Sequence, residues 1–519
     1  MTSKSIKNFY KFSLFLPILL YVGERSYLSY DEGFYALQAR WMIQNKNWLV
    51  PSWWGEYYLD RTIGIQFLIA KSQEIFGNSS FAAHLPVTLA SALMLFVTVK
   101  LHQILIHKRE AIFSALILST TYLWFNFAHL ATQDIIFALL VNIGLFSFIK
   151  LNKSKDPLHL FSFGAWIGLA FMMKTFFVVI AIFAILPFLF FKKEILSYKL
   201  FWIGLFIGFT PYILWSISID QYIDRNIIIY LFDKLNTLSS KNTFTNPFYY
   251  YIWNIPINFL PWSLFALLGL FVNYKNIKKG DSIIVFYPII FIFLISFFST
   301  KTPYYALPIA PILSLNAYMG IKETIKSKRL SLVLKILGTR LIPTCVFLLI
   351  TTYFFVIRKS LDLNFKEECF LILGLILFAL SWLLINKFHK PKHIIFLLIL
   401  GPYLLTTSIV QSGLITDRSR SVRESLEYCF LKNNISNEVI QVNKNDINSS
   451  SLQSKIIKIS LLTPKLGKGI NSLSELNDSE YAWATLNNKL LKEKLSYEII
   501  FTDDNIKPWK LIKKKITDN

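Results

Sequence analysis

Charged residues interrupt this apolar chain at a few points where they could act on a phosphate. The acidic candidates are Asp31, Glu32, Asp60 and Asp134, and the basic candidates are Arg61, Lys174 and Lys301. A carboxylate can act as general base on an acceptor hydroxyl. Arginine and lysine can stabilise the negative charge that builds on a phosphate leaving group. These residue types therefore favour transfer of a group away from a phosphate.

Each acidic candidate also has a purely structural interpretation. Glu32 follows Ser29 at the spacing of a capping box, so Asp31 and Glu32 could begin a helix and complement its dipole. Asp60 could occupy the first turn of the next helix, beside Arg61. Asp134 could cap the helix that follows it. The sequence leaves both interpretations open at each position.

The basic candidates allow two interpretations as well. Lys174 lies between two apolar runs. An ionisable residue in such a place indicates a functional role, and the alternative is a lysine that contacts the phosphates of lipid headgroups. Lys301 lies in a short turn followed by Tyr304 and Tyr305, whose hydroxyls could bind the same phosphate oxygens. A simple anchor at the membrane interface is the alternative. Arg61 could grip a phosphate with two hydrogen bonds or extend from a membrane surface.

The composition places these residues in a membrane protein. The chain has 519 residues, of which 54% are hydrophobic and 16% charged, with a mean hydropathy of +0.47. These values exclude an ordinary soluble enzyme, a disordered protein and a coiled coil. The net charge of +23 is interpreted as a topology signal, with no nucleic acid as partner. Three scattered cysteines and seven scattered histidines predict neither a zinc site nor a disulfide framework.

Thirteen apolar runs are long enough to suggest membrane spans. They are 9–23, 80–106, 111–128, 133–150, 158–175, 176–191, 199–219, 251–273, 281–299, 303–321, 337–357, 367–386 and 393–414. A span of a hydrocarbon core about 30 Å thick needs roughly 20 residues. Lipid offers the backbone no hydrogen-bond partner, so the runs must be helices. The sequence thus predicts an all-α polytopic membrane protein.

The distribution of lysine and arginine predicts the orientation. If the N-terminus is cytoplasmic, the cytoplasmic segments hold 23 of these residues and the outer segments up to residue 414 hold 13. This bias supports a cytoplasmic N-terminus. An odd number of spans then places the C-terminus outside. All six of Asp31, Asp60, Arg61, Asp134, Lys174 and Lys301 then fall at the outer face.

Two domains are predicted. Residues 1–414 would form the transmembrane catalytic domain, with a first outer loop at 24–79 and a second at 220–250. Residues 31–46 and 61–76 of the first loop have the pattern of juxtamembrane helices. Residues 415–519 are polar with apolar patches and would form a small extracytoplasmic α+β domain.

Several motifs resemble those of the polytopic glycosyltransferases of the GT-C class, and within them the protein O-mannosyltransferase and 4-amino-4-deoxy-L-arabinose transferase superfamily. They are Tyr30–Ala36, Gly55–Arg61, Phe76-Gly77 with Ala82–Pro86, Thr132–Asp134, Gly168–Lys174, Asn246–Tyr251, Pro261-Trp262 and Lys301–Tyr305. The resemblance covers about residues 10–320. Beyond this region only the topology matches.

The resemblance implies a fold with thirteen spans in a bacterial-type inner membrane and a cavity that faces away from the cytoplasm. The implied donor is a sugar on a polyprenyl monophosphate. Because phosphate is a good leaving group, no cofactor is required; a divalent metal would be compatible with this chemistry, but the sequence does not indicate one. Asp31 would be the catalytic carboxylate, with Glu32, Asp60 and Asp134 as supporting acids. The residues that would bind the lipid phosphate are Arg61, Lys301, Tyr58, Tyr304 and Lys174.

Two positions depart from the pattern of many aminoarabinose transferases. Phe34 stands where many have arginine, and the region near Thr237 lacks their basic residue, for which Lys234 or Lys241 would have to substitute. The resemblance therefore implies the donor chemistry of the superfamily and leaves the sugar and the acceptor open.

The predicted function is that of an inverting glycosyltransferase acting on an extracytoplasmic lipid, glycan or protein acceptor. A transporter or flippase of a lipid-linked sugar is the alternative, but the charges gather at one surface and no pair of broken helices is evident. A polysaccharide ligase or polymerase would have longer late loops than 299–303 and 358–366.

Overall fold

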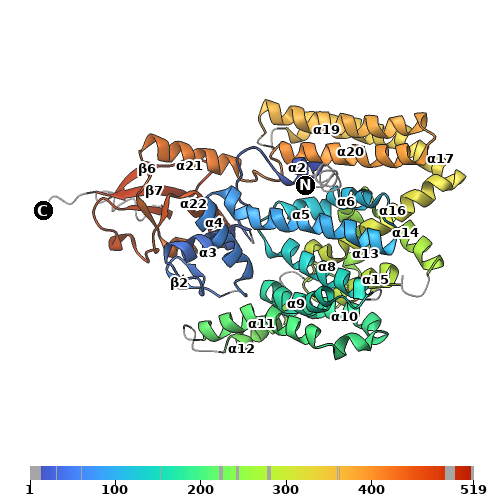
Figure 1. The fold of residues 1–519 in the computed structure, drawn as a ribbon. Helices are drawn as coiled ribbons and strands as arrows, with labels where there is room; N and C mark the ends of the chain where they lie inside the picture. Colours follow the sequence, from blue (N-terminus) through green and yellow to red (C-terminus); the bar gives the residue numbers. More distant parts are fainter. Residues whose placement is uncertain are drawn as a thin grey trace, which may run out of the picture. The chain divides into compact units, whose positions relative to one another are not determined.

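The computed structural model divides into two compact units, and each is described by itself (Figure 1). The described residues are 13–30, 32–59, 61–151, 154–220, 222, 226–240, 245–277, 282–358, 361, 363–485 and 497–515. The transmembrane unit comprises Met1–Gly23, Val87–His129 and Gln133–Ile415, and the loop–tail unit comprises Glu24–Pro86, Leu130–Thr132 and Thr416–Asn519. Asp31, Asp60 and Lys241 lie outside the described residues.

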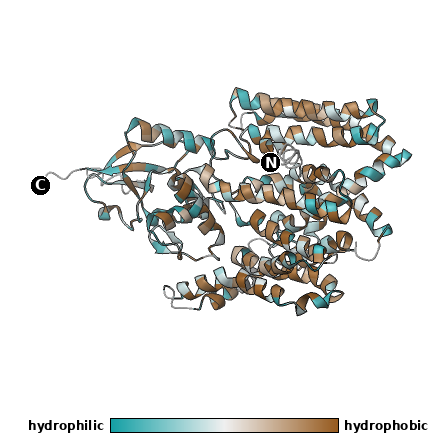
Figure 2. Cartoon of the chain, in the orientation of Figure 1, coloured by the Kyte–Doolittle hydropathy of each residue, from teal (hydrophilic) through white to brown (hydrophobic). Residues whose placement is uncertain are grey.

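The transmembrane unit is helical, and the middle parts of its helices are strongly hydrophobic (Figure 2). Its helices are α2 (Leu16–Leu19), α5 (Ser80–Leu105, from Val87), α6 (Ala111–Ser119), α7 (Tyr122–Ala128), α8 (Gln133–Leu151), α9 (Pro157–Lys174), α10 (Val178–Phe190), α11 (Lys199–Ile219), α12 (Ile227–Ser240), α13 (Tyr250–Asn258), α14 (Ser263–Lys275), α15 (Ile283–Ser296), α16 (Ala310–Lys326), α17 (Lys328–Ile336), α18 (Ile342–Thr352), α19 (Phe365–Leu383) and α20 (Pro391–Gln411). Shorter 3-10 or π turns are η1 (Thr175–Phe177), η2 (Lys193–Ser197), η4 (Pro303–Ile309), η5 (Leu337–Leu341), η6 (Tyr353–Ile357) and η7 (Leu384–Lys387).

The predicted all-α membrane fold is confirmed. Seven helical runs in the described part of the chain are long and apolar enough to cross a membrane, or nine if two bent pairs each count as one span. One run, Pro157–Phe190, contains both of the spans expected at 158–175 and 176–191, with η1 at their junction. The count of thirteen spans stays a prediction.

The sequence predicted no pair of broken helices, and this prediction is wrong. The axes of α6 and α7 differ by 70°, and those of α13 and α14 by 112°. The indole nitrogen of Trp262, at the second break, donates a hydrogen bond of 2.8 Å to the hydroxyl of Thr120, at the first. Trp262 is fully buried. A side-chain hydrogen bond thus joins the two breaks inside the protein, where irregular backbone is tolerated at membrane depth.

The loop–tail unit combines the first long loop with the C-terminal segment. The loop contributes α3 (Glu32–Gln44), β1 (Ser52–Trp53), β2 (Glu56–Tyr57) and α4 (Gly64–Phe76), so both juxtamembrane helices predicted from its sequence are present. The tail contributes α21 (Arg420–Lys432), α22 (Ser450–Leu462), β3 (Val439–Val442), β4 (Lys465–Leu466), β5 (Tyr481–Thr485), β6 (Tyr497–Phe501), β7 (Trp509–Lys514) and the turns η8 (Lys444–Asp446) and η9 (Leu473–Glu475).

The strands of the tail form one sheet in the order β4-β3-β5-β7-β6. The pairs β3–β4 and β3–β5 are parallel, whereas β5–β7 and β6–β7 are antiparallel. A small apolar core combines side chains of this sheet, such as Ala482 of β5 and Ile512 of β7, with Leu473 of η9. The tail therefore has the predicted α+β character. Its association with the first loop in one compact unit was not predicted.

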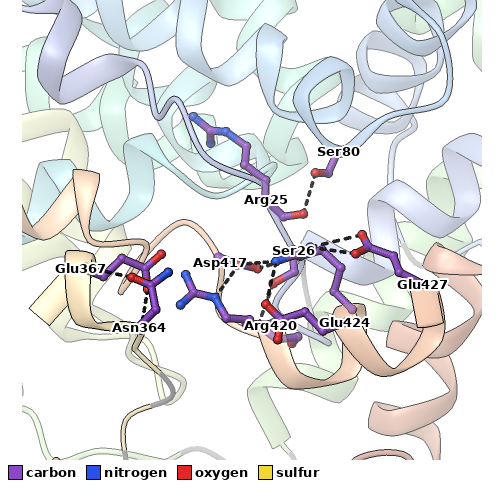
Figure 3. Close-up of polar contacts among 11 residues, drawn as sticks. Arg25, Ser26, Ser80, Asn364, Glu367, Asp417, Arg420, Glu424 and Glu427 are labelled. Carbon is purple, nitrogen blue, oxygen red and sulfur yellow. Dashed lines mark hydrogen bonds and ion pairs between the residues drawn. The ribbon is translucent and has the colours of Figure 1, made fainter.

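Two polar clusters stabilise the loop–tail unit. The Arg40 guanidinium donates to the backbone carbonyls of four residues at the end of α22, and these are Ser460, Leu461, Thr463 and Pro464. Asp417 accepts from Arg420 at 3.0 Å and from Arg423 at 3.1 Å, in the buried cluster that Figure 3 shows. Buried charges are tolerated only when paired in this way.

Candidate active site

In the transmembrane unit, two of the predicted residues form a buried ion pair. Asp134, in the first turn of α8, accepts a hydrogen bond of 2.5 Å from Lys174, the last residue of α9. Their side chains are only 8% and 10% exposed. The rings of Tyr304 and Tyr305 lie 4.5 and 4.9 Å from the ammonium nitrogen, measured to their centroids. Asp134 therefore balances the charge of Lys174. This ion pair was not predicted from the sequence.

The backbone directly after Lys174 is strained. Thr175 has φ 47° and ψ −131°, a conformation that β-branched residues rarely adopt. It ends α9 and begins η1. Strained residues persist where the surrounding structure holds them, and they gather at functional sites. The strain at Thr175 coincides with the turn that carries the Lys174 ammonium.

Lys301 is buried in a different environment, in the turn before η4. Its residue is 5% exposed, and its ammonium donates to the carbonyl oxygens of Asn246 at 2.8 Å and Phe298 at 2.5 Å. Burial lowers the pKa of Lys301. Within the described ranges no carboxylate forms an ion pair with it. Its charge is thus stabilised by backbone dipoles.

The turn of Lys301 is joined to the aromatic segment that precedes α13. The Asn246 amide returns a hydrogen bond of 3.2 Å to the Lys301 carbonyl, so the two residues bind each other reciprocally. The Tyr251 hydroxyl donates to the Thr302 carbonyl at 3.1 Å. These contacts join two motifs that are separate in the sequence. Asn246 was quoted from the sequence only as part of the aromatic motif, and no role at the site was predicted for it.

In the loop–tail unit, Glu32 is held by His84. The His84 Nε2 atom lies 2.7 Å from a Glu32 carboxylate oxygen, and its Nδ1 atom lies 2.6 Å from the Ser80 carbonyl oxygen. Glu32 and His84 are both almost fully buried. A carbonyl only accepts, so Nδ1 carries a proton, and a second proton lies between Nε2 and Glu32. His84 was quoted within a motif, but no role was predicted for it.

The predicted phosphate ligands of this unit lie among aromatic rings. The Arg61 guanidinium carbon is 5.4 Å from the centroid of the Tyr35 ring. Tyr58 is 42% exposed, and its ring centroid is 5.4 Å from that of Phe34. Phe34 also packs against Trp53 at 4.8 Å. Phe34, which stands where many aminoarabinose transferases were expected to have arginine, is therefore part of an aromatic cluster.

The predicted site residues are thus shared between the units. The transmembrane unit holds Asp134, Lys174, Lys301 and Tyr304, and the loop–tail unit holds Glu32, Tyr58 and Arg61. Asp31 and Asp60 lie outside the described residues. Among the residues that are described, no group of three or more His, Cys, Asp or Glu side chains could hold a metal ion.

Comparisons with known proteins agree with this architecture. Residues 60–216 match the family model described as dolichyl-phosphate-mannose-protein mannosyltransferase. The undecaprenyl phosphate-alpha-4-amino-4-deoxy-L-arabinose arabinosyl transferase of Wigglesworthia glossinidia brevipalpis is 27% identical over 327 residues, covering 58% of this chain and 57% of the relative. The enzyme of the same name from Photorhabdus laumondii is 25% identical over 321 residues, covering 59% and 58%. The chain thus matches less than two thirds of these relatives' length.

A solved structure extends the similarity to the whole fold. The crystal structure of ArnT from Cupriavidus metallidurans bound to undecaprenyl phosphate superposes with a TM-score of 0.75 and 14% identity, covering 100% of this chain and 99% of that one. The chain therefore has the GT-C fold of that structure. Sequence and fold together confirm the predicted resemblance to the protein O-mannosyltransferase and aminoarabinose transferase superfamily.

Proposed function

We propose that this protein is a glycosyltransferase that moves a sugar from a polyprenyl-phosphate donor to an extracytoplasmic acceptor. The observation that carries the proposal is the buried ammonium of Lys301, which carbonyl oxygens hold in the turn before Tyr304. A preorganised cation in a water-poor site strongly stabilises negative charge that develops on a leaving phosphate. The relatives named above, which use undecaprenyl phosphate sugars, support this choice of donor.

The proposed reaction is a single displacement. The acceptor oxygen attacks the anomeric carbon, the bond from that carbon to the phosphate oxygen breaks, and polyprenyl phosphate leaves. Asp31 takes the proton of the acceptor hydroxyl as general base. Arg61 and Lys301 stabilise the phosphate charge, and Tyr58 and Tyr304 donate hydrogen bonds to its oxygens. One displacement inverts the configuration of the sugar.

The remaining roles belong to the same proposal. Asp60 would pair with Arg61 and hold it in position. Asp134 and Lys174 would act together as a neutral pair that shapes the phosphate site. Glu32 would orient the neighbouring Asp31 through its buried contact with His84. We place the N-terminus in the cytoplasm and residues 415–519 outside it, with residues 1–414 as the catalytic domain.

The transporter alternative is not favoured. The two bent helix pairs are the feature that would support it, because transporters build midplane sites from broken helices. Here the buried side chain of Trp262, at one break, is hydrogen-bonded to Thr120, at the other. The relatives reported above are named as transferases.

The test is sugar transfer by the purified protein from radiolabelled polyprenyl-phosphate sugars, beginning with aminoarabinose and mannose donors and a membrane extract as acceptor. We compare the wild type with Asp31→Asn and Lys301→Met. Lys366→Met is the matched control, because Lys366 is exposed in α19 and predicted at the same face. Loss of a preorganised charge should reduce the rate about 100-fold or more.

Three outcomes would contradict parts of the proposal. Full activity in Asp31→Asn would refute the general base and leave the donor class intact. A retained sugar configuration would refute the single displacement. Saturable donor binding without transfer to any acceptor would favour a transporter.

A further inference from the structure

A basic cavity of about 460 Å³ lies in the transmembrane unit, apart from every residue proposed for catalysis. Its wall comes from the N-terminus of α6, the C-terminal turn of α16 and the start of α20. The charged lining residues are Glu110, Lys322, Lys326, Lys390 and Lys392. The three segments are far apart in the sequence, so the fold gathers this charge.

The one carboxylate that lines the cavity balances only a small part of its positive charge. Four lysines face one carboxylate, that of Glu110, which already accepts a hydrogen bond from the Tyr318 hydroxyl. The Lys322 ammonium lies 3.4 Å from His107 Nε2 and 5.5 Å from the Tyr318 ring centroid. Lys326 and Lys390 are exposed. An anion that enters the cavity would therefore meet several lysine donors.

The start of α20 adds to this potential. Lys390 is the N-cap, Pro391 occupies the first turn, and no side chain caps the helix. The first backbone N–H groups of a helix and its dipole favour an anion, phosphate in particular. A helix end alone offers an anion only backbone N–H groups. The lysines that line the cavity add positively charged side chains to them.

The same cavity also has an apolar side. Ile325, Pro391 and Ile395 line it together with the lysines. An inorganic ion would gain nothing from these side chains, whereas a lipid presents a phosphate next to hydrocarbon. All three segments that form the cavity wall also lie on the side of the membrane that the excess of lysine and arginine predicts to be cytoplasmic. An anionic lipid of the inner leaflet would meet them there.

We propose that this cavity binds the phosphate headgroup of an anionic phospholipid. Lys322, Lys326, Lys390 and Lys392 would contact the phosphate, and Ile325 and Ile395 the glycerol or the first acyl carbons. Basic pockets between transmembrane helices are the usual receptors for such headgroups. The site would be a lipid contact at the face opposite to the one proposed for sugar transfer.

The test uses the full-length protein in nanodiscs of phosphatidylcholine with increasing fractions of phosphatidylglycerol. Bound phosphatidylglycerol is counted by native mass spectrometry, and thermal unfolding is followed in parallel. Two cavity lysines are replaced in Lys390→Gln/Lys392→Gln. The matched control is Lys192→Gln/Lys193→Gln, which removes the same charge from a segment predicted at the same face and absent from the cavity lining.

At about 1 kcal/mol for each basic residue near an anionic lipid, the cavity variant should bind phosphatidylglycerol about 30-fold more weakly, and the control should bind like the wild type. Equal losses in both double variants would refute the cavity and indicate a diffuse charge effect. Inorganic phosphate that stabilises the protein as well as phosphatidylglycerol does, and competes with it, would refute the lipid as ligand. Either result can be told from folding failure, because the control and the unfolding curves report on the fold.

Discussion

Arg40 offers the sharpest test of how the first loop and the C-terminal segment form one unit. Its guanidinium, on α3, donates to four carbonyl oxygens at the end of α22, at 2.9, 2.7, 2.8 and 3.1 Å. The last carbonyls of a helix have no partner within it. Arg40 therefore caps a helix that lies about 420 residues further along the chain. Burial lowers the pKa of Arg40 to about 10, so the side chain remains charged at neutral pH.

The perturbation is Arg40→Met, which keeps much of the side-chain volume and removes all donors. Hydrogen bonds to a charged group contribute about 1.5–3 kcal/mol each, but four on one side chain are not additive. Leaving the carbonyls buried without a donor should cost about 3 kcal/mol in the stability of α22. Hydrogen exchange at the amides of Ser450–Leu462 should then be about 100-fold faster.

Two further variants define the interpretation of Arg40→Met. Arg40→Lys keeps the charge but has one nitrogen, which cannot span four carbonyls, so we expect an intermediate acceleration of exchange. Lys465→Met removes an exposed cation from the same region and should leave exchange unchanged. Exchange in Arg40→Met within about threefold of the wild type, less than 0.7 kcal/mol, would refute the argument that these hydrogen bonds stabilise the unit.

Three other perturbations follow from buried contacts and can be measured by thermal or denaturant unfolding. Lys174→Met leaves Asp134 buried and unpaired and should cost about 3–5 kcal/mol, whereas adding Asp134→Asn should recover most of that loss; a double variant as unstable as the single one would contradict this. Thr175→Gly should stabilise the protein by about 1 kcal/mol because glycine adopts its backbone angles without strain, and a destabilised variant would show that Thr175 is not strained. His84→Leu should cost about 3 kcal/mol because Glu32 loses its buried partner, and unchanged stability would mean that Glu32 is solvated.

Local sequence signals predicted the local elements well. The helices expected at 31–46 and 61–76 are present as α3 and α4, because polar starts and apolar periodicity act within a few residues. The spans were evident because about 20 apolar residues in a row have few other uses. The broken helices were missed for the same reason: an average over an apolar run is insensitive to a change of direction. Pro261 and Trp262 at the second break were the available signal.

Contacts between distant segments could not be predicted from one sequence. The contact from Arg40 to α22 and the reciprocal bonds between Asn246 and Lys301 join residues with no shared local pattern. The tail gave no motif that would indicate a partner. Its association with the first loop is therefore a result of the structure alone.

The structure also separates two lysines that the sequence treated as equivalent, and this leads to a final prediction. Lys174 is neutralised by Asp134 at 2.5 Å, so the pair contributes little net charge to an approaching phosphate. Lys301 is stabilised by carbonyl dipoles, which leave its full charge in place. Charge that is uncompensated in the resting site acts most strongly on the transition state.

Lys301→Met should therefore lower kcat about 100-fold with a smaller change in unfolding temperature. The pair variant Asp134→Asn/Lys174→Met should keep kcat within about tenfold, since it removes no net charge. Single-turnover transfer assays beside unfolding curves separate these effects. The distinction between the two lysines would fail if the pair variant lost as much rate as Lys301→Met while both proteins remained folded. In that case the Asp134–Lys174 pair, and not only the cation of Lys301, would act on the leaving phosphate.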